Sequence, residues 1–430
     1  MRPSIIVSAC LLGVTGWAIA ERLEDTDYLP LDHPAINYAQ AEPNDAVARL
    51  DDAIDAGKVK LDYAPNGWGY LPAVLKALKI NTDSQVLVFS RTSIQGNHIS
   101  PQTPRAIYFN DEVSVGYVQN GDVLEFAALD PDQGIELYVM DANQTRKPGL
   151  GKRPDCLNCH LGGITLGIPG MVVSSVHPAS DLTRDMHGSA FITDQRTPFK
   201  DRWGGWYVTG THGAQVHLGN NTELVDPVRP GNASHTGTQN VTKLDDKFNT
   251  SKYLATTSDI VALLTLEHQT RMTNLLIRIG WDARIAIHDS KFEGAVRDKI
   301  NSEIDEMVNY MLFIDEDPLK EPVTGVSTFS KTFPQRGPSS QRDKLGRSLR
   351  DFDLKTRLFR YPLSYMIYSQ TFDHLPGAAK EQVYQRLFDI LTGSDKSASV
   401  LSEDTRMAIL AILRDTKPDL PKYWTALPRQ

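Results

Sequence analysis

Two cysteines and a histidine at positions 156, 159 and 160 constrain this chain more than any other feature. The segment that contains them reads D-C-L-N-C-H-L. The sequence holds three cysteines in all, and the third, Cys10, lies in an apolar stretch near the N-terminus. Residues three apart share one face of a helical turn. The spacing therefore predicts a turn of helix that presents two thiols and the neighbouring imidazole to one common ligand.

C-x-x-C-H is the attachment motif of c-type haem, and at these residues the chain resembles the c-type cytochromes. The resemblance implies thioether bonds from Cys156 and Cys159 to one haem, with His160 as the proximal axial ligand of the iron. One such motif is present, so we expect one covalent haem c per chain. Residues 21–155 precede the motif and look strand-rich, unlike a small helical cytochrome. The whole chain also resembles a group of large exported bacterial proteins with a single C-x-x-C-H motif and no assigned function.

Two other chemistries use closely spaced cysteines. A thioredoxin-like dithiol is typical of a βαβ setting, whereas here Pro154 precedes the motif and a Gly162-Gly163 loop follows it. A structural zinc site needs further thiols or histidines at short spacing, and the sequence has no second cysteine pair. Both alternatives stay open, with haem attachment favoured because the motif coincides with an export signal.

The N-terminus is typical of a secretory signal peptide. Arg2 supplies a positive charge, residues 5–20 (IIVSACLLGVTGWAIA) are apolar, and the run closes on A-I-A. This run is shorter than the ~20 residues that a spanning helix needs, so a retained membrane anchor is a weaker alternative, and a lipoprotein attached at Cys10 is weaker still. We expect residues 1–20 to be removed and the mature protein to be periplasmic or otherwise exported, with no integral membrane segment.

The charge pattern indicates which kinds of partner the chain can bind. The formal net charge is −8, and the charged residues are spread along the chain rather than gathered in a basic block. Nucleic-acid binding normally requires a basic patch, so we expect no nucleic-acid partner. The expected partner is a redox protein or a small-molecule electron donor or acceptor.

The hydrophobic patterning predicts an α+β chain with a strand-rich N-terminal part, a loop-rich haem-binding middle and an all-helical C-terminal part. We divide it into 1–20 (signal peptide), 21–141 (α+β, small antiparallel sheet), 142–250 (haem c-binding region) and 251–430 (helical region). Strands are expected at 85–90, 105–109, 113–118, 123–126 and 136–140, and helices at 44–56, 70–80, 259–287, 295–313, 349–372, 378–391 and 403–414. Asn120-Gly121 predicts a tight hairpin turn, because both residues tolerate positive φ, and Thr257 or Ser258 is expected to cap the helix at 259–287.

The second axial position of the iron decides what a haem can do. Histidine or methionine there makes a six-coordinate, electron-transferring centre, whereas an open position admits a small molecule. The candidates for a distal ligand are Met171, His212, His217 and His268. Met171 follows His160 by only eleven positions, so it can reach round the porphyrin only if the intervening chain is extended.

The three histidine candidates have ordinary alternatives. His212 and His217 follow a segment at 202–213 (RWGGWYVTGTHG) whose aromatic residues and glycines suit a flat ligand, but a Gly-rich hairpin with surface histidines fits equally well. His268 lies on the apolar stripe of the predicted helix at 259–287, where a hydrogen-bonded core histidine is the commoner case. A non-haem metal site is a further, weaker hypothesis, built on histidines without tight spacing: His177, His187, His212, His217 and His235.

Three classes of function follow from the motif. The first is electron transfer through one covalently bound haem. The alternative is a single-haem oxidoreductase, peroxidase- or oxygenase-like, with an open distal side and Arg202 or a nearby histidine as an accessory group. The third is a haem-based binding protein whose partner face is the charged, aromatic segment at 349–362, although a salt-bridged amphipathic helix is the simpler interpretation of that segment. The sequence assigns no catalytic residue.

Overall fold

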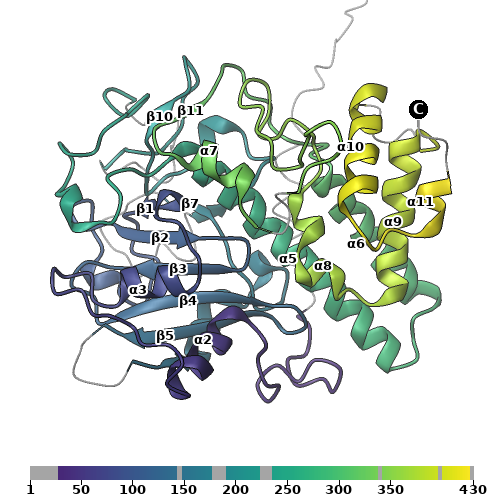
Figure 1. The fold of residues 1–430 in the computed structure, drawn as a ribbon, viewed down its shortest axis with the longest axis horizontal. Coiled ribbons are helices and arrows are strands. Elements are labelled where there is room, and N and C mark those ends of the chain that lie inside the picture. Colours follow the sequence, from purple (N-terminus) through teal and green to yellow (C-terminus); the bar gives the residue numbers. More distant parts are fainter. Residues whose placement is uncertain are drawn as a thin grey trace, which may run out of the picture.

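A computed structural model describes residues 28–142, 148–176, 190–222, 235–337, 341–395 and 400–426. The expected signal peptide lies outside these residues. The fold is α+β, as predicted, with an antiparallel sheet built mainly from the N-terminal part and helices that follow it (Figure 1). None of the helices within the described ranges has both the length and the apolar character that crossing a bilayer requires.

A seven-stranded sheet forms the centre of the N-terminal part. Its strand order is β6-β5-β4-β3-β2-β1-β9, and neighbouring strands are antiparallel. The bounds are β1 Val86–Val88, β2 Arg105–Phe109, β3 Val113–Tyr117, β4 Val123–Asp130, β5 Gly134–Asp141, β6 Leu150–Lys152 and β9 Trp206–Tyr207. The predicted strands at 85–141 are therefore present, and the sheet also takes β6 and β9 from the expected haem-binding region. Two small sheets pair β7 (Ser174–Val176) with β8 (Ala190–Ile192) and β10 (Gly210–Thr211) with β11 (Thr324–Gly325).

The predicted hairpin between β3 and β4 is present. Gly121 donates its backbone N–H to the carbonyl of Val118 at 3.0 Å. Asn120 adopts a positive φ of 59°, but Gly121 does not share that conformation. The turn is thus a looser one than the two-residue turn that the Asn-Gly pair favours.

The helices divide into short ones around the sheet and longer ones toward the C-terminus. Their bounds are α2 Ala46–Asp55, α3 Leu71–Ala77, α4 Leu157–His160, α5 Ile260–His288, α6 Gly294–Met311, α7 Phe329–Thr332, α8 Gln370–Asp373, α9 Gly377–Thr392, α10 Glu403–Thr416 and α11 Lys422–Ala426. Six of the seven predicted helices correspond to α2, α3, α5, α6, α9 and α10.

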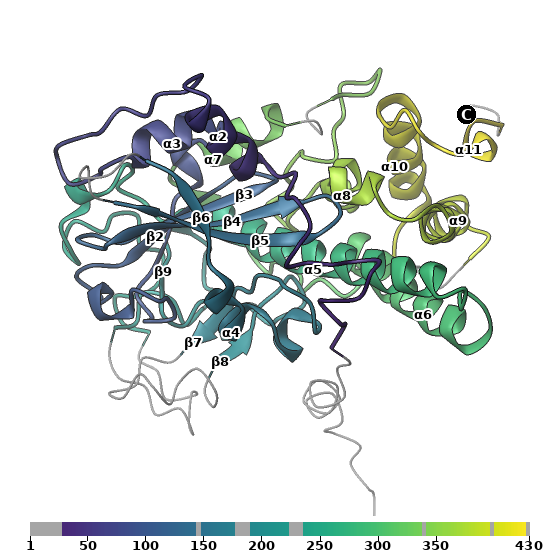
Figure 2. The same cartoon turned by 90° about the horizontal axis from the view of Figure 1, so that it is seen from below.

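The two faces of the sheet are covered by different elements. Helices α2 and α3 cover one face, where Leu87, Tyr108 and Phe126 belong to a compact apolar cluster (Figure 2). The other face, which includes Val88 and Leu137, packs into a larger core together with α5 and the C-terminal helices. Helix α4, which carries Cys159 and His160, lies on this second side with β7 and β8.

Helix α5 runs through the larger core. Its 29 residues are buried on nearly every side, and the buried set includes polar residues such as Glu267, His268 and Asn274. The helix begins after Asp259, whose carboxylate accepts hydrogen bonds from the amides of Val261 and Ala262. The cap is therefore Asp259 rather than Thr257 or Ser258, because the Ser258 hydroxyl instead accepts from Leu87 N and donates to the Tyr207 carbonyl, joining β1 to β9.

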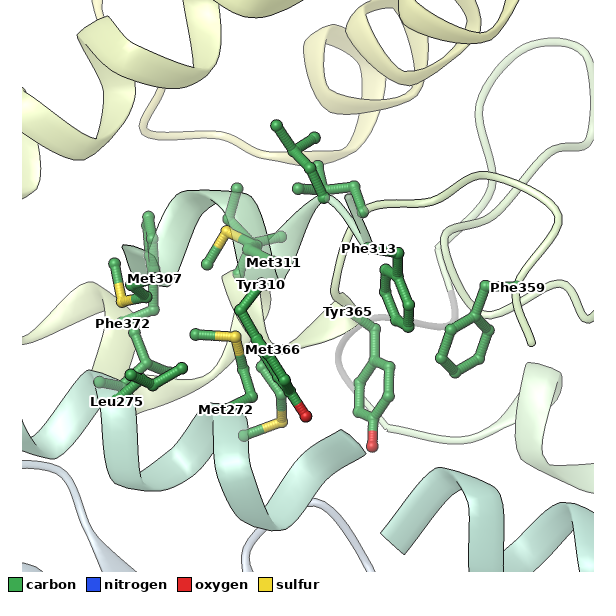
Figure 3. Packing of buried hydrophobic residues seen from close by; sticks show 14 of the residues in the cluster. Met272, Leu275, Met307, Tyr310, Met311, Phe313, Phe359, Tyr365, Met366 and Phe372 are labelled. Atoms are coloured by element: carbon green, nitrogen blue, oxygen red, sulfur yellow. The ribbon is translucent and has the colours of Figure 1, made fainter. Parts of the chain in front are cut away.

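The helix predicted at 349–372 is wrong. The segment forms a tight hairpin bridged between Phe352 and Phe359, and helix appears only in the short turns at Tyr365–Tyr368 and α8. The carboxylate of Asp353 accepts hydrogen bonds from the amides of residues 355, 356 and 357, which turns the chain back on itself. Phe359 and Tyr365 then pack with residues of α5 and α6 (Figure 3). Tertiary packing of aromatic residues has overridden the helical spacing.

Candidate haem-attachment site

The motif forms a continuous helical turn. A 3-10 turn at Pro154–Cys156 runs into α4 at Leu157–His160, with the proline at the start of the turn. A proline fits there because its fixed φ suits a helix and its missing N–H would lack a partner in any case. Both cysteines are free thiols; Cys156 is half-buried and Cys159 is exposed. The helical turn that the spacing predicts is therefore present, and it carries both thiols and the imidazole.

His160 is held by a short closed loop. The backbone N–H of Gly170 donates to the carbonyl of His160 at 2.9 Å, and the Nδ1 atom of His160 lies 2.8 Å from the carbonyl oxygen of Gly170. Between them, Leu161 and Pro169 form an isolated antiparallel bridge. A carbonyl oxygen can only accept, so Nδ1 carries the proton and Nε2 carries the free lone pair. This is the hydrogen bond that metal-ligating histidines commonly make through their second nitrogen.

Helix α5 fastens this loop through two polar side chains. Asn274 accepts from the amide of Met171 at 3.2 Å and donates to its carbonyl at 2.7 Å, and Arg278 donates to the carbonyl of Leu166 at 2.8 Å. Gly170 lies directly on Asn274, since a Cβ at position 170 would come within 2.6 Å of its Oδ1 atom. The loop behind His160 is therefore positioned by residues more than a hundred positions later in the chain.

Burial controls the charge of the motif. Burial lowers the pKa of His160, although its hydrogen bond to Gly170 acts in the opposite direction, so the imidazole stays neutral at pH 7. Burial and the neighbouring carboxylate of Asp155 raise the pKa of the Cys156 thiol. The first thiol of a reactive dithiol typically has a lowered pKa, and Cys156 shows the opposite.

The motif is not arranged as a closed zinc site. Within the described ranges, one group of three His, Cys, Asp or Glu side chains brings its ligand atoms within 4.8 Å of one another, and it consists of His33, His288 and Asp289. That group is already hydrogen-bonded internally: His33 Nδ1 accepts from Ala35 N, and its Nε2 lies 3.2 Å from Asp289 Oδ1. The sequence hinted at no such cluster, because His33 and His288 are remote from each other along the chain.

Met171 lies on the proximal side of the motif. Its backbone is bonded on both its N–H and its carbonyl to Asn274, directly after Gly170. Gly170 contacts the Nδ1 side of the His160 ring, whereas an iron would bind at Nε2, on the opposite side. The side chain of Met171 packs against the larger apolar core, and its backbone follows the residue that bonds to Nδ1, which disfavours Met171 as a distal ligand.

His212 and His217 lie together elsewhere in the core. Both are buried, their ring centres are 4.8 Å apart, and each has an Nδ1 atom without a hydrogen-bond partner. Gly210 packs against Ile260 near the start of α5, whereas Met171 is bonded to Asn274. Fourteen residues separate these two points of α5, which is about 21 Å along a helix. The structure therefore does not bring this histidine pair to His160.

The segment around these histidines is not the hairpin we expected. Strand β9 pairs with β1, and β10 pairs with β11, so the WYVTGTH stretch joins two different sheets. Trp203 is fully buried, with its ring centre 5.1 Å from that of His217. A Cβ at Gly204 would come within 2.8 Å of the Ser175 hydroxyl. The missing side chain at Gly204 lets strand β7 approach closely, and the side chain of Trp203 packs inside the protein.

His268 is a hydrogen-bonded core residue. Its Nδ1 atom lies 2.5 Å from Gln195 Oε1, and its Nε2 atom lies 2.7 Å from the Ser364 hydroxyl. Its ring stacks on Phe313, with centres 4.4 Å apart. Both nitrogens are occupied, so this arrangement leaves none for iron and matches the alternative interpretation of the sequence.

Arg202 is also committed to the core. Its Nη1 atom pairs with Glu267 at 3.1 Å, while Nε and Nη2 donate to the carbonyls of Thr197 and Gln195. The side chain is 4 % exposed. Arg202 therefore holds the chain against α5 rather than facing a ligand.

Three histidines of the weaker metal-site hypothesis remain. His177 and His187 lie outside the described residues. His235 is exposed, and its Nδ1 atom lies 3.4 Å from Gln239 Nε2, in a side chain that also bonds to the backbone of His217. Comparison with protein families, with curated proteins and with solved structures finds no match to this chain.

Proposed function

We propose that this chain is an exported c-type haem protein that transfers electrons through one haem, bound covalently at Cys156 and Cys159 with His160 as the proximal ligand. The hydrogen bond from His160 Nδ1 to the Gly170 carbonyl carries this proposal. It selects the tautomer with a free Nε2 lone pair and fixes the ring in the helical turn that carries two free thiols. A haem supplies a one-electron couple when bound, and the partner is a redox protein or a small electron donor or acceptor.

The chain's own residues would do three things for that group. Cys156 and Cys159 anchor it, His160 supplies a neutral imidazole nitrogen, and Asn274 holds the loop that orients the imidazole. The raised pKa of Cys156 argues against a redox dithiol, since such chemistry needs the thiolate. The ligand atoms of the motif are also not gathered in the manner of a zinc site.

A second candidate is a haem oxidoreductase with an open sixth position. It is supported by the placement of the four distal candidates: Met171 lies on the proximal side, His268 is fully hydrogen-bonded, and His212 and His217 pack with each other. Within the described residues, none of these four side chains is placed to bind the iron opposite His160. An open position would bind carbon monoxide or peroxide, whereas a filled one would not.

The test is expression with cytochrome maturation proteins and recovery of the exported protein. We expect a c-type pyridine haemochrome from the denatured wild type and its loss in a Cys156→Ser, Cys159→Ser double variant. A Ser251→Ala variant, at an exposed serine whose hydroxyl bonds to Asn249, leaves the motif intact and serves as a processing control. Wild-type protein without covalent haem would overturn the proposal. A reduced spectrum unchanged by carbon monoxide supports electron transfer, and a shifted spectrum supports the oxidoreductase.

A further inference from the structure

An ion pair lies on the apolar face of the sheet that packs toward α5. Arg105 at the start of β2 and Glu125 on β4 are joined at 2.9 Å, and their side chains are 21 % and 13 % exposed. Most neighbours on this face belong to the larger apolar core, among them Val86, Val88, Ile107, Phe109, Ala127, Leu129 and Leu137. A charged pair on such a surface calls for a polar or charged group nearby, because burying charge without compensation is costly.

The pair is built into the sheet. Arg105 crosses over Gly116 of β3, where a Cβ would come within 2.8 Å of its Nε atom, so only glycine leaves room for the guanidinium. The Oε1 atom of Glu125 accepts hydrogen bonds from the Ser93 hydroxyl at 2.6 Å and from Gln95 Nε2 at 3.1 Å. The Nε atom of Arg105 is buried and has no hydrogen-bond partner. Glu125 is thus fully held, while Arg105 keeps one free donor.

The strand register places this pair beside the motif. Glu125 pairs with Val139, and Val139 pairs with Gly151 of β6, the strand that leads into the motif. Arg153 then bonds to the Leu137 carbonyl and turns the chain toward the same face of the sheet. Helix α4 follows Arg153 on this face of the sheet (Figure 2). Glu125 of the pair therefore lies two strands away from β6, on the face of the sheet that carries the motif.

We propose that Arg105 and Glu125 belong to the haem site and set its reduction potential in opposite directions, Arg105 raising it and Glu125 lowering it. This inference rests on the proposed function. Reduction adds one negative charge to the bound group, so a nearby cation stabilises the reduced state and a nearby anion stabilises the oxidised state. Each charge is now offset by the other, and removing either one leaves the field of its partner acting alone.

The test is a redox titration of the haem-loaded full chain, against the same mediator couple, for the wild type, Arg105→Gln, Glu125→Gln and the double variant. We expect Arg105→Gln to lower the equilibrium constant for reduction about tenfold, which is 59 mV for one electron. Glu125→Gln should raise it by a similar factor, and the double variant should lie near the wild type. Arg342→Gln and Asp351→Asn form the matched control, because they remove the charges of an exposed pair joined at 2.9 Å.

The outcomes separate the two proposals. Wild-type protein without haem would overturn the proposed function and this inference with it. The protein can instead load haem while Arg105→Gln and Glu125→Gln shift the equilibrium constant for reduction in the same direction, or by less than twofold. That result would overturn only the role of the pair. If Arg105→Gln does not load haem, the Glu125→Gln variant alone tests the role of the pair. A rise in its equilibrium constant for reduction supports that role, and a fall contradicts it.

Discussion

The imidazole of His160 and the backbone of Gly170 hold each other at two points, through Nδ1 to the Gly170 carbonyl at 2.8 Å and through the Gly170 amide to the His160 carbonyl at 2.9 Å. The Gly170 carbonyl that accepts from the ring belongs to the peptide unit between Gly170 and Met171. The N–H of that unit donates to Asn274 of α5, so the orientation of the ring depends on a contact with α5.

Substitution of Gly170 by alanine should loosen the loop behind His160. The new Cβ would lie 2.6 Å from Asn274 Oδ1 and 3.1 Å from Thr165 Cβ, so one of these groups has to move. We expect a loss of about 1–3 kcal/mol in the free energy of unfolding, typical of overpacked sites, measured by urea denaturation. Gly162→Ala is the matched control, since its Cβ would meet only Ile164 at 3.9 Å. Equal effects of the two variants would contradict this packing.

Substitution of Met171 by leucine should leave the haem spectrum unchanged. Met171 follows Gly170, which bonds to Nδ1 rather than to the nitrogen that would bind iron, and its contacts with Asn274 are made by its backbone. The optical spectrum of the loaded variant, with and without carbon monoxide, should therefore match that of the wild type. Loss of a low-spin spectrum in Met171→Leu would identify this residue as the sixth ligand after all.

The buried His268 should make the protein sensitive to acid. Burial lowers the pKa of His268 to about 3, from 6.5. Its stabilising contribution is therefore complete above pH 6.5 and is lost as the pH falls toward 3, because the unfolded chain then binds a proton that the native ring does not. At pH 5 this amounts to about 2 kcal/mol.

The measurement compares the free energy of unfolding of the wild type and His268→Gln at pH 7.5 and at pH 5. Glutamine removes the titrating group and keeps a side chain that can donate and accept hydrogen bonds. We expect the wild type's advantage to shrink by about 2 kcal/mol at the lower pH. An advantage that stays constant between the two pH values would show that His268 does not titrate in this way.

Arg350 should not be replaceable by lysine. Its guanidinium carbon lies 3.6 Å from the ring centre of Phe333 and 4.6 Å from that of Tyr365, and its Nη1 atom bonds to Asp111 at 2.7 Å. A lysine ammonium cannot lie flat on an aromatic ring while it bonds to a carboxylate in the plane of a guanidinium. We expect Arg350→Lys to lower the free energy of unfolding by about 2–4 kcal/mol, somewhat less than the loss of a buried ion-pair partner because the charge is kept.

Arg342→Lys is the control for this effect. Arg342 pairs with Asp351 at 2.9 Å, but its side chain is 40 % exposed. Exposed pairs contribute about 0.2–1 kcal/mol, so guanidinium denaturation should barely distinguish this variant from the wild type. Similar losses in the free energy of unfolding of Arg342→Lys and Arg350→Lys would mean that packing of Arg350 against the two rings does not add to stability.

Local patterns predicted much of this fold. The strands expected at 105–109 and 113–118 correspond to β2 and β3 to within one residue, and the helix expected at 259–287 is α5 to within a residue at each end. The failure at 349–372 has a physical cause, since Asp353 bonds to nearby amides and Phe359 stacks on Phe352 at 5.3 Å. Such competition between side-chain hydrogen bonds and helix is invisible to periodicity.

The candidate site was also only partly predictable from the sequence. Cys156, Cys159 and His160 are a prediction from the sequence alone, because the C-x-x-C-H motif is local. Asn274 could not be predicted in this way, because it meets Met171 only through the tertiary fold. A buried asparagine within an apolar helix is a signal that could have been noticed, since buried polar groups need partners. The sequence does not say which partner it has.

The position of Asn274 and Arg278 has a consequence for the order of events under the proposed function. In a chain that emerges from N to C, residues 156–160 appear well before the helix that fastens their loop at Leu166 and Met171. Haem attachment could then precede the docking of α5. The helix would in that case fix the loop behind His160 only after the group is in place.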